Sequence, residues 1–168
     1  ILGVLSKVDY QIVFSDTPGV IIPHHTLHEA MMHCVKLSLE DADVILYMVE
    51  TNKQSLKDSK YLEIISKSQI PVVLLINKID LVSQDVVSEL LLYWSKQIPK
   101  SIIIPISALE KFNTPRIIEE ILNLLPDSPA YFPKDTLTDK SERFIVSEVI
   151  RQKILQRYKQ EIPYSVEV

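Results

Sequence analysis

Hydrophobic residues in this chain gather in short unbroken runs rather than in alternating patterns. The clearest run, 72–76, reads Val-Val-Leu-Leu-Ile and ends directly in the polar tetrapeptide Asn77-Lys78-Ile79-Asp80. A short apolar run without alternation indicates a strand buried on both faces, as in a parallel sheet flanked by helices. Ligands of such sheets bind beyond the carboxyl ends of the strands, so we expect Asn77 and Asp80 at a binding edge.

The rest of the chain alternates between predicted strands and predicted helices. Apolar runs predict further strands, the first two as a hairpin, at 1–5, 10–14, 43–49 and 101–106. Helical spacing predicts helices at about 27–39, 83–97, 114–125 and 141–160. Ser55-Leu56-Lys57-Asp58 resembles a capping box that opens one more helix, and Thr114 before Pro115 predicts an N-cap. This order predicts an α/β fold with a doubly wound, mostly parallel sheet.

The last quarter of the chain differs in composition. Residues 126–134 contain three prolines and two aromatic residues, which favours an ordered linker, extending over 126–140. The helix predicted after Ser141 carries apolar residues at helical spacing and basic residues at other positions, which could contact RNA or form a solvated face. Residues 163–168 alternate like a strand. We therefore predict the start of a second domain over 141–168.

Composition limits the class of protein. The 168 residues are 46% hydrophobic and 24% charged, which is typical of a folded domain, and the apolar runs are shorter than the roughly 18 residues of a membrane span. The net charge of −4 gives no overall attraction to nucleic acid. The single cysteine, Cys34, excludes an internal disulfide, and we expect it to be packed as an apolar residue. The chain begins at Ile1 with neither an initiating Met nor a basic leader, so we expect neither a signal peptide nor a natural start.

Asn77-Lys78-Ile79-Asp80 has the residue types that guanine recognition requires. A guanine presents a ring N–H and an amino group, which one carboxylate can accept together, whereas adenine would leave Asp80 unpaired. An unpaired buried polar group costs about 1–3 kcal/mol, which corresponds to one to two decades in affinity. Asn77 would tether the acceptor edge of the base and neighbouring loops, and the Lys78 stem would lie across the base. The alternative is that Asn77 and Asp80 only end a strand and cap a helix.

Two further motifs follow predicted strands in the order found in GTPases, and together the three resemble that family. Asp16-Thr17-Pro18-Gly19 resembles the Asp-x-x-Gly motif, although such a sequence also forms ordinary turns. In this resemblance Asp16 holds Mg²⁺ through water, and the Gly19 N–H approaches the γ-phosphate. Ser107-Ala108 resembles the third base-binding element, in which the Ala108 N–H meets the guanine oxygen. GTP or GDP and Mg²⁺ are the implied cofactors, and residues 1–125 the implied partial GTPase domain.

The chain departs from the GTPase pattern in several places. With only Gly3 and Gly19 it contains no Gly-x-x-x-x-Gly-Lys-[Ser/Thr] loop for the phosphates, and the threonine of the first switch is absent. Val20 stands where many GTPases have a glutamine that orients water, so no catalytic side chain is assigned. Lys111 replaces the glycine that is usual in the Ser107-Ala108 loop, which leaves the geometry of that loop open.

The tail resembles one family in particular. Its linker and the start of its second domain are similar to those of the Era family of bacterial GTPases, at Phe132-Pro133-Lys134-Asp135, Thr138-Asp139, Arg143-Phe144, Glu148-Val149-Ile150-Arg151 and 161–166. The resemblance implies a GTP-hydrolysing assembly factor with a C-terminal KH domain, acting on 16S rRNA and the small ribosomal subunit. It also implies a cytoplasmic location, with peripheral association at the inner membrane.

The missing motifs lead to further expectations. We expect the chain to be a piece of such a GTPase that binds GTP weakly by itself, hydrolyses none at a useful rate, and self-associates through unpaired sheet edges. The alternative is a non-catalytic GTPase relic that serves as an RNA- or ribosome-binding scaffold, and the coding sequence upstream of Ile1 distinguishes the two. Four histidines, His24, His25, His28 and His33, invite a metal hypothesis, but no acidic or cysteine partner has a recognised ligand spacing.

Overall fold

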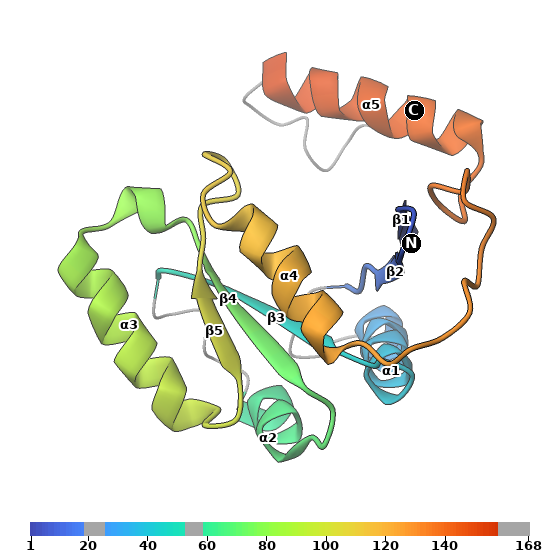
Figure 1. Ribbon diagram of the computed structural model, residues 1–168. Coiled ribbons are helices and arrows are strands. Elements are labelled where there is room, and N and C mark those ends of the chain that lie inside the picture. Colours follow the sequence, from blue (N-terminus) through green and yellow to red (C-terminus); the bar gives the residue numbers. More distant parts are fainter. Residues whose placement is uncertain (19–25, 53–58, 158–168) are drawn as a thin grey trace. The chain divides into compact units, whose positions relative to one another are not determined.

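The computed structural model describes residues 1–18, 26–52 and 59–157, without the side chains of 26–28 and 59–61. The chain divides into two compact units (Figure 1). The sheet unit runs from Pro18 to Ser128, and the hairpin unit combines Ile1–Thr17 with the chain from Pro129 onward. Each unit is described by itself.

The sheet unit is built on a three-stranded parallel sheet with the order β3-β4-β5. The strands are β3 (Ile45–Glu50), β4 (Val72–Asn77) and β5 (Ile102–Pro105). The helices of this unit are α1 (Thr26–Glu40), α2 (Ser59–Lys67), α3 (Gln84–Gln97) and α4 (Thr114–Leu124), and a 3-10 turn covers Ile79–Leu81. Strands alternating with helices around a parallel sheet confirm the predicted α/β fold class.

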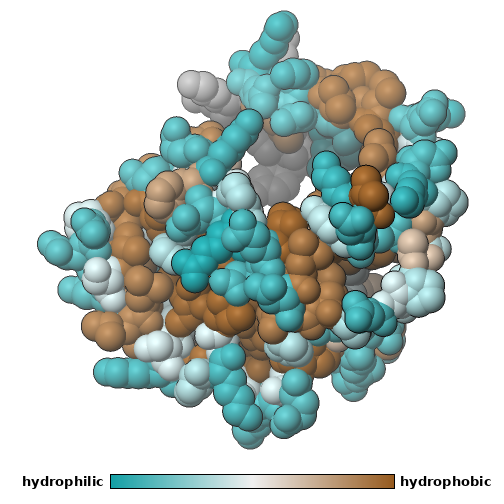
Figure 2. Space-filling view, viewed as in Figure 1, coloured by the Kyte–Doolittle hydropathy of each residue, from teal (hydrophilic) through white to brown (hydrophobic). Residues whose placement is uncertain are grey.

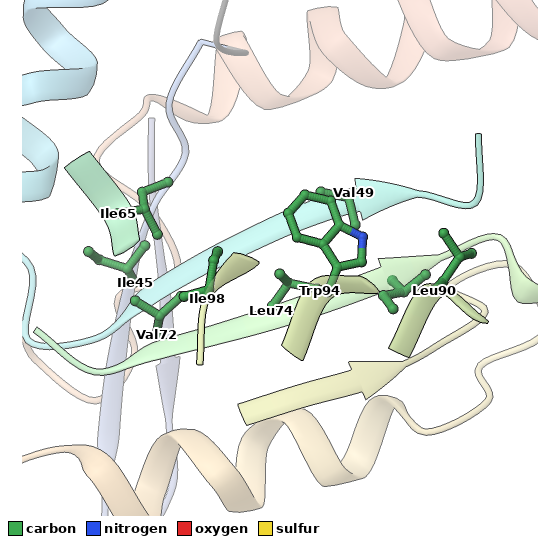
Figure 3. Packing of buried hydrophobic residues seen from close by; sticks show 9 residues of the cluster. Ile45, Val49, Ile65, Val72, Leu74, Leu90, Trp94 and Ile98 are labelled. Carbon is green, nitrogen blue, oxygen red and sulfur yellow. The ribbon is translucent and has the colours of Figure 1, made fainter. Parts of the chain in front are cut away.

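The central strand β4 is buried on both faces, as its unbroken apolar run predicts. Val72, Leu74 and Ile76 face a core built by α2 and α3, in which Trp94 of α3 is 1% exposed (Figure 3). The residues between them, Val73 and Leu75, face a second core. That second core also contains side chains of β5 and α4. The strand is therefore held from both sides, and its polar end is fixed in place.

The hairpin unit contains the antiparallel strands β1 (Leu2–Ser6) and β2 (Gln11–Ser15), one residue later than predicted. The predicted linker lies along the outer edge of β1. The Val4 N–H donates to the Leu137 carbonyl at 2.8 Å, and Gly3 forms an antiparallel bridge with Thr138. The linker therefore covers backbone groups of β1 that would otherwise be an open sheet edge.

Side chains complete this attachment of the linker. The Gln11 amide donates to the Phe132 carbonyl and accepts from the Phe132 N–H, both at 2.9 Å. The Thr138 hydroxyl donates to the Leu2 carbonyl at 2.7 Å, and the Leu2 N–H donates to the Asp139 carboxylate at 2.9 Å. The linker is thus an ordered part of this unit.

Helix α5 (Glu142–Arg157) follows the linker. Ser141 caps it as predicted, because its hydroxyl accepts the Phe144 N–H at 3.3 Å. No residue of α5 is buried, and its apolar side chains stand exposed beside hydrophilic ones (Figure 2), at Ile145, Val146, Val149 and Ile150. The strand predicted over 163–168 and the capping box at 55–58 lie outside the described residues.

Two expectations are wrong. Asn113, not Thr114, is the N-cap of α4, because Thr114 already has helical geometry and Pro115 follows inside the first turn. Cys34 is exposed on α1 rather than packed, since the buried side of that helix is formed by Met32 and Val35. No helix among the described residues is long and apolar enough to cross a membrane.

Candidate functional site

Asn77 connects two loops at the carboxyl edge of the sheet. It is the last residue of β4, and its side-chain oxygen accepts the Lys78 N–H at 2.8 Å and the Ala108 N–H at 3.0 Å. One residue before Asn77, the Ile76 carbonyl accepts the Ile106 N–H at 2.8 Å. The loops that follow β4 and β5 are therefore held together through Asn77, whose Nδ2 forms a weak contact with the sulfur of Met48 at 3.8 Å.

Lys78 has a constrained backbone and a directed side chain. Its φ of 66° is in the left-handed region, which L residues adopt at a cost and which occurs often at functional sites. Its ammonium lies 2.6 Å from the Glu50 carboxylate, and Glu50 is the register partner of Asn77 at the end of β3. The Lys78 side chain therefore crosses from the end of β4 to the end of β3.

Asp80 presents its carboxylate at the same edge. It lies in the 3-10 turn Ile79–Leu81 and is exposed. Within the described part of the chain, its carboxylate has no hydrogen bond or ion pair. The Ile79 N–H donates to the Ile106 carbonyl at 3.3 Å, so the turn that carries Asp80 is attached to the end of β5.

The loop after β5 is tight. Ser107 is 2% exposed, and its hydroxyl accepts the Glu110 N–H at 3.2 Å. Ser107 and Phe112 exchange backbone hydrogen bonds of 3.0 and 3.3 Å across the loop. Lys111 has a φ of 55°, which explains why a glycine suits this position. The loop closes with lysine there, and it leaves Ala108 exposed next to Asn77.

These groups have the polarity that a guanine base requires. Asp80 offers an acceptor for two donors, while the Ala108 N–H and the Asn77 Nδ2 offer donors for the acceptor edge of the base. All of them belong to the sheet unit and are held by bonds formed within it. The structure thus brings together the predicted residues Asn77, Lys78, Asp80, Ser107 and Ala108; their roles in binding stay predictions.

The residues predicted to contact phosphate and metal are Asp16 and Gly19. Asp16 belongs to the hairpin unit, directly after β2; its N–H donates to the Ile1 carbonyl at 2.9 Å, and its side chain is exposed. An exposed carboxylate at a strand end fits a ligand that acts on Mg²⁺ through water. Gly19 lies outside the described residues.

The histidine hypothesis gains no support from the part of the chain that the structure describes. His33 is exposed on α1, and no group of three or more His, Cys, Asp or Glu side chains there could hold a metal ion. His24 and His25 lie outside the described residues, as does the side chain of His28.

Sequence reasoning missed Glu50. It is an ordinary acidic residue at the end of a predicted strand, and no motif includes it. Glu50 can be identified only from its position opposite Asn77 on the neighbouring strand, and this requires the register of β3 and β4.

Comparisons with known proteins agree with this geometry. A family model described as 50S ribosome-binding GTPase matches residues 1–78. Proteins named GTPase Era from Staphylococcus haemolyticus and Alkaliphilus metalliredigens are 39% and 40% identical to the whole chain. The chain spans 56% and 57% of these two relatives.

Solved structures of GTP-binding proteins are also similar to this chain. The structure of Aquifex aeolicus Era bound to GDP.AlF4⁻ matches with a TM-score of 0.79 and 34% identity, over 98% of this chain and 57% of that one. Elongation factor SelB from Methanococcus maripaludis, in complex with a GTP analogue, matches with a TM-score of 0.60 at 19% identity over 80% of this chain and 30% of that one. The SelB match shows the fold alone.

Proposed function

We infer that this chain is a member of the Era-type GTPases, which it matches over its whole length, and on that premise we propose that its sheet unit recognises the guanine base of GTP and GDP. The observation that carries the proposal is the Asp80 carboxylate, without a partner among the described residues, at the sheet edge that also holds the Ala108 N–H and Asn77. The bonds of Asn77 to Lys78 and Ala108 hold this arrangement. Lys78, at the junction of both loops, supplies a hydrocarbon stem against the base.

Selectivity follows from the number of hydrogen bonds that each base can make. Guanine would satisfy both oxygens of Asp80 with its ring N–H and amino group. Adenine has a ring acceptor at the corresponding place, so it would leave the carboxylate desolvated and unpaired. This difference amounts to about 1–3 kcal/mol, or roughly tenfold to a hundredfold in affinity.

Phosphate binding and hydrolysis are a separate part of the proposal. Asp16 would hold Mg²⁺ through water, and the Gly19 N–H would contact the γ-phosphate. When bound, Mg²⁺ neutralises charge on the phosphate oxygens during transfer. No described side chain is assigned as a general base. We expect this chain by itself to bind GTP weakly and to release no measurable phosphate, and a fluorescent-nucleotide titration that gives micromolar affinity would contradict this.

We further propose that the protein assists assembly of the small ribosomal subunit through 16S rRNA. Support comes from its homology to proteins named Era and from the basic residues exposed on α5, Arg143, Arg151, Lys153 and Arg157. Arg151 lies 3.6 Å from Glu148, which reduces its net contribution to an RNA surface. Co-sedimentation with purified 30S and 50S subunits tests the assignment, and binding to 50S alone would refute it.

Base recognition is tested with nucleoside monophosphates, which carry the base but need little phosphate binding. Ligand-observed NMR is suitable because it detects weak binding. We expect GMP to bind at least tenfold more tightly than AMP. The Asp80→Asn variant should bind xanthosine monophosphate more tightly than GMP, because the amide donates to the carbonyl that replaces the guanine amino group. Equal binding of GMP and AMP by the unaltered chain would refute the proposal.

Asp85→Asn serves as the matched control for Asp80→Asn. Asp85 is another exposed aspartate close in sequence, in the first turn of α3. It should leave the preference for GMP unchanged. A loss of preference in both variants would mean that the change reflects overall charge and not contact with the base.

A further inference from the structure

The Lys78 ammonium could compete with a base for the Asp80 carboxylate. Lys78 and Asp80 are two residues apart at the same strand end, one with a flexible ammonium and the other with a free carboxylate. A lysine side chain carries three donors on a four-carbon stem, so its ammonium is a natural partner for a nearby carboxylate. If it bound Asp80, it would occupy the acceptor that the base needs.

Glu50 directs Lys78 away from Asp80. The Lys78 ammonium lies 2.6 Å from the Glu50 carboxylate, and the Asp80 carboxylate has no partner among the described residues. The β3–β4 register fixes the position of Glu50, because Glu50 pairs with Asn77 at the ends of the two strands. Both strands are anchored in the core through Val49 and Ile76, so Glu50 has a defined place relative to Lys78.

The backbone of Lys78 limits the paths that its side chain can take. Its φ of 66° and the bond from its N–H to the Asn77 oxygen fix the direction in which the side chain leaves the chain. The hydrocarbon stem of Lys78 can still adopt several rotamers, and the side chain would lose conformational entropy when it contacts a base. The ion pair with Glu50 selects among these rotamers before a ligand arrives.

We propose that Glu50 is a positioning residue for guanine recognition: it holds the Lys78 stem across the ends of β4 and β3 and so keeps the Asp80 carboxylate open to the base. This inference rests on the proposed function and deepens it. Glu50 does not touch the base. Its effect operates entirely through the place of the Lys78 ammonium.

The expected effect is modest, because both side chains are about half exposed, 47% for Lys78 and 52% for Glu50. Ion pairs of this kind change an equilibrium by roughly two- to fivefold. Glu50→Gln should therefore weaken GMP binding by about that factor, mainly by letting Lys78 compete for Asp80. Binding of AMP, which makes no use of the Asp80 carboxylate, should change less than binding of GMP.

A double-substitution cycle separates positioning from a general structural effect. Lys78→Met keeps the apolar stem and removes the ammonium, so in its background Glu50→Gln should have no further effect on GMP binding. The loss caused by Glu50→Gln alone should also shrink at about 1 M salt, where charges are screened within about 3 Å. Glu40→Gln is the matched control, since Glu40 pairs with Lys36 at 3.6 Å on α1 and lies outside the site.

The experiment is ligand-observed NMR with GMP and AMP on the 168-residue chain and these variants, with amide spectra to verify folding. A two- to fivefold loss of GMP affinity in Glu50→Gln that disappears in the Lys78→Met background supports the inference. Unchanged GMP binding in Glu50→Gln, or an equal loss in the Lys78→Met background, overturns it while the preference for GMP over AMP stands. If the unaltered chain shows no such preference, the proposed function fails, and the role of Glu50 fails with it.

Discussion

Gln11 offers the sharpest test of how the linker is held in the hairpin unit. Its side-chain amide forms two hydrogen bonds of 2.9 Å with the backbone of Phe132, one as donor and one as acceptor. It thereby imitates the pairing of a neighbouring strand, across 121 residues of sequence. Gln11→Ala removes both bonds at once, together with a bond of 3.0 Å from Gln11 to the Ser6 hydroxyl within the hairpin, without changing the backbone of the linker.

The magnitude follows from these two bonds. A hydrogen bond contributes about 0.5–1.5 kcal/mol net, so the pair contributes roughly 1–3 kcal/mol. Because both bonds are only partly buried, water can replace the lost partner, and we expect the lower part of this range, about 1–2 kcal/mol. With about 1.4 kcal/mol for each factor of ten, attachment of the linker should weaken roughly five- to thirtyfold.

Amide hydrogen exchange measures this loss at two places. The Phe132 N–H loses its acceptor directly, so faster exchange there is expected in any case. The informative amide is that of Val4, which donates to Leu137 and not to Gln11. If the linker detaches as one segment, Val4 should also exchange about five- to thirtyfold faster in Gln11→Ala.

Gln152→Ala is the matched control, because Gln152 is an exposed glutamine on α5 in the same unit. It should leave the exchange of Val4 unchanged. Faster exchange at Phe132 alone in Gln11→Ala would refute the reasoning, since it would show that the bonds along the linker form independently of one another.

Two further predictions concern single side chains. The pKa of Asp139 is lowered to about 2, first because its carboxylate accepts the Leu2 N–H and then because of Lys140. The stabilising effect of the ionised Asp139 carboxylate should be complete above about pH 4 and lost as the pH falls towards 2, which an NMR titration can follow. Asp139→Asn should remove this pH dependence, and Asp135→Asn should keep it. Lys111→Gly should raise stability in urea unfolding by up to about 1 kcal/mol, because glycine relieves the left-handed backbone at a partial cost in chain entropy, whereas Lys96→Gly in α3 should lower it by about 1 kcal/mol. A lower stability of Lys111→Gly would contradict the strain argument.

The sequence was informative wherever structure depends on neighbouring residues. Residues 72–76 predicted β4 because a run of five consecutive apolar residues is typical of a strand covered on both faces, and the structure buries all of them. Asn77 and Asp80 were predicted at the binding edge because they come directly at the carboxyl end of that strand. The cap at Ser141 was also predicted correctly, since a capping hydroxyl acts within its own turn.

Contacts between distant residues were beyond this reasoning. The pair of Glu50 and Lys78 depends on the register of two parallel strands, which no local pattern specifies. The bonds of Gln11 to Phe132 likewise depend on where the linker returns. Asn113 was missed as the cap of α4 because Thr114-Pro115 has the more typical sequence, and Asn113 adopts a φ of 59° while its side chain donates to the Pro105 carbonyl at 2.9 Å.

The residues proposed for base recognition and the residue proposed to act on Mg²⁺ belong to different units of this chain. The groups proposed to contact guanine are held by short-range bonds at the ends of β4 and β5, within the sheet unit, and their anchor is a strand buried on both faces. Asp16, proposed to act on Mg²⁺, belongs to the hairpin unit, where its backbone pairs with Ile1. On this proposal, discrimination between bases requires that the sheet unit be folded, and nucleoside monophosphates can measure it whether or not the chain hydrolyses GTP.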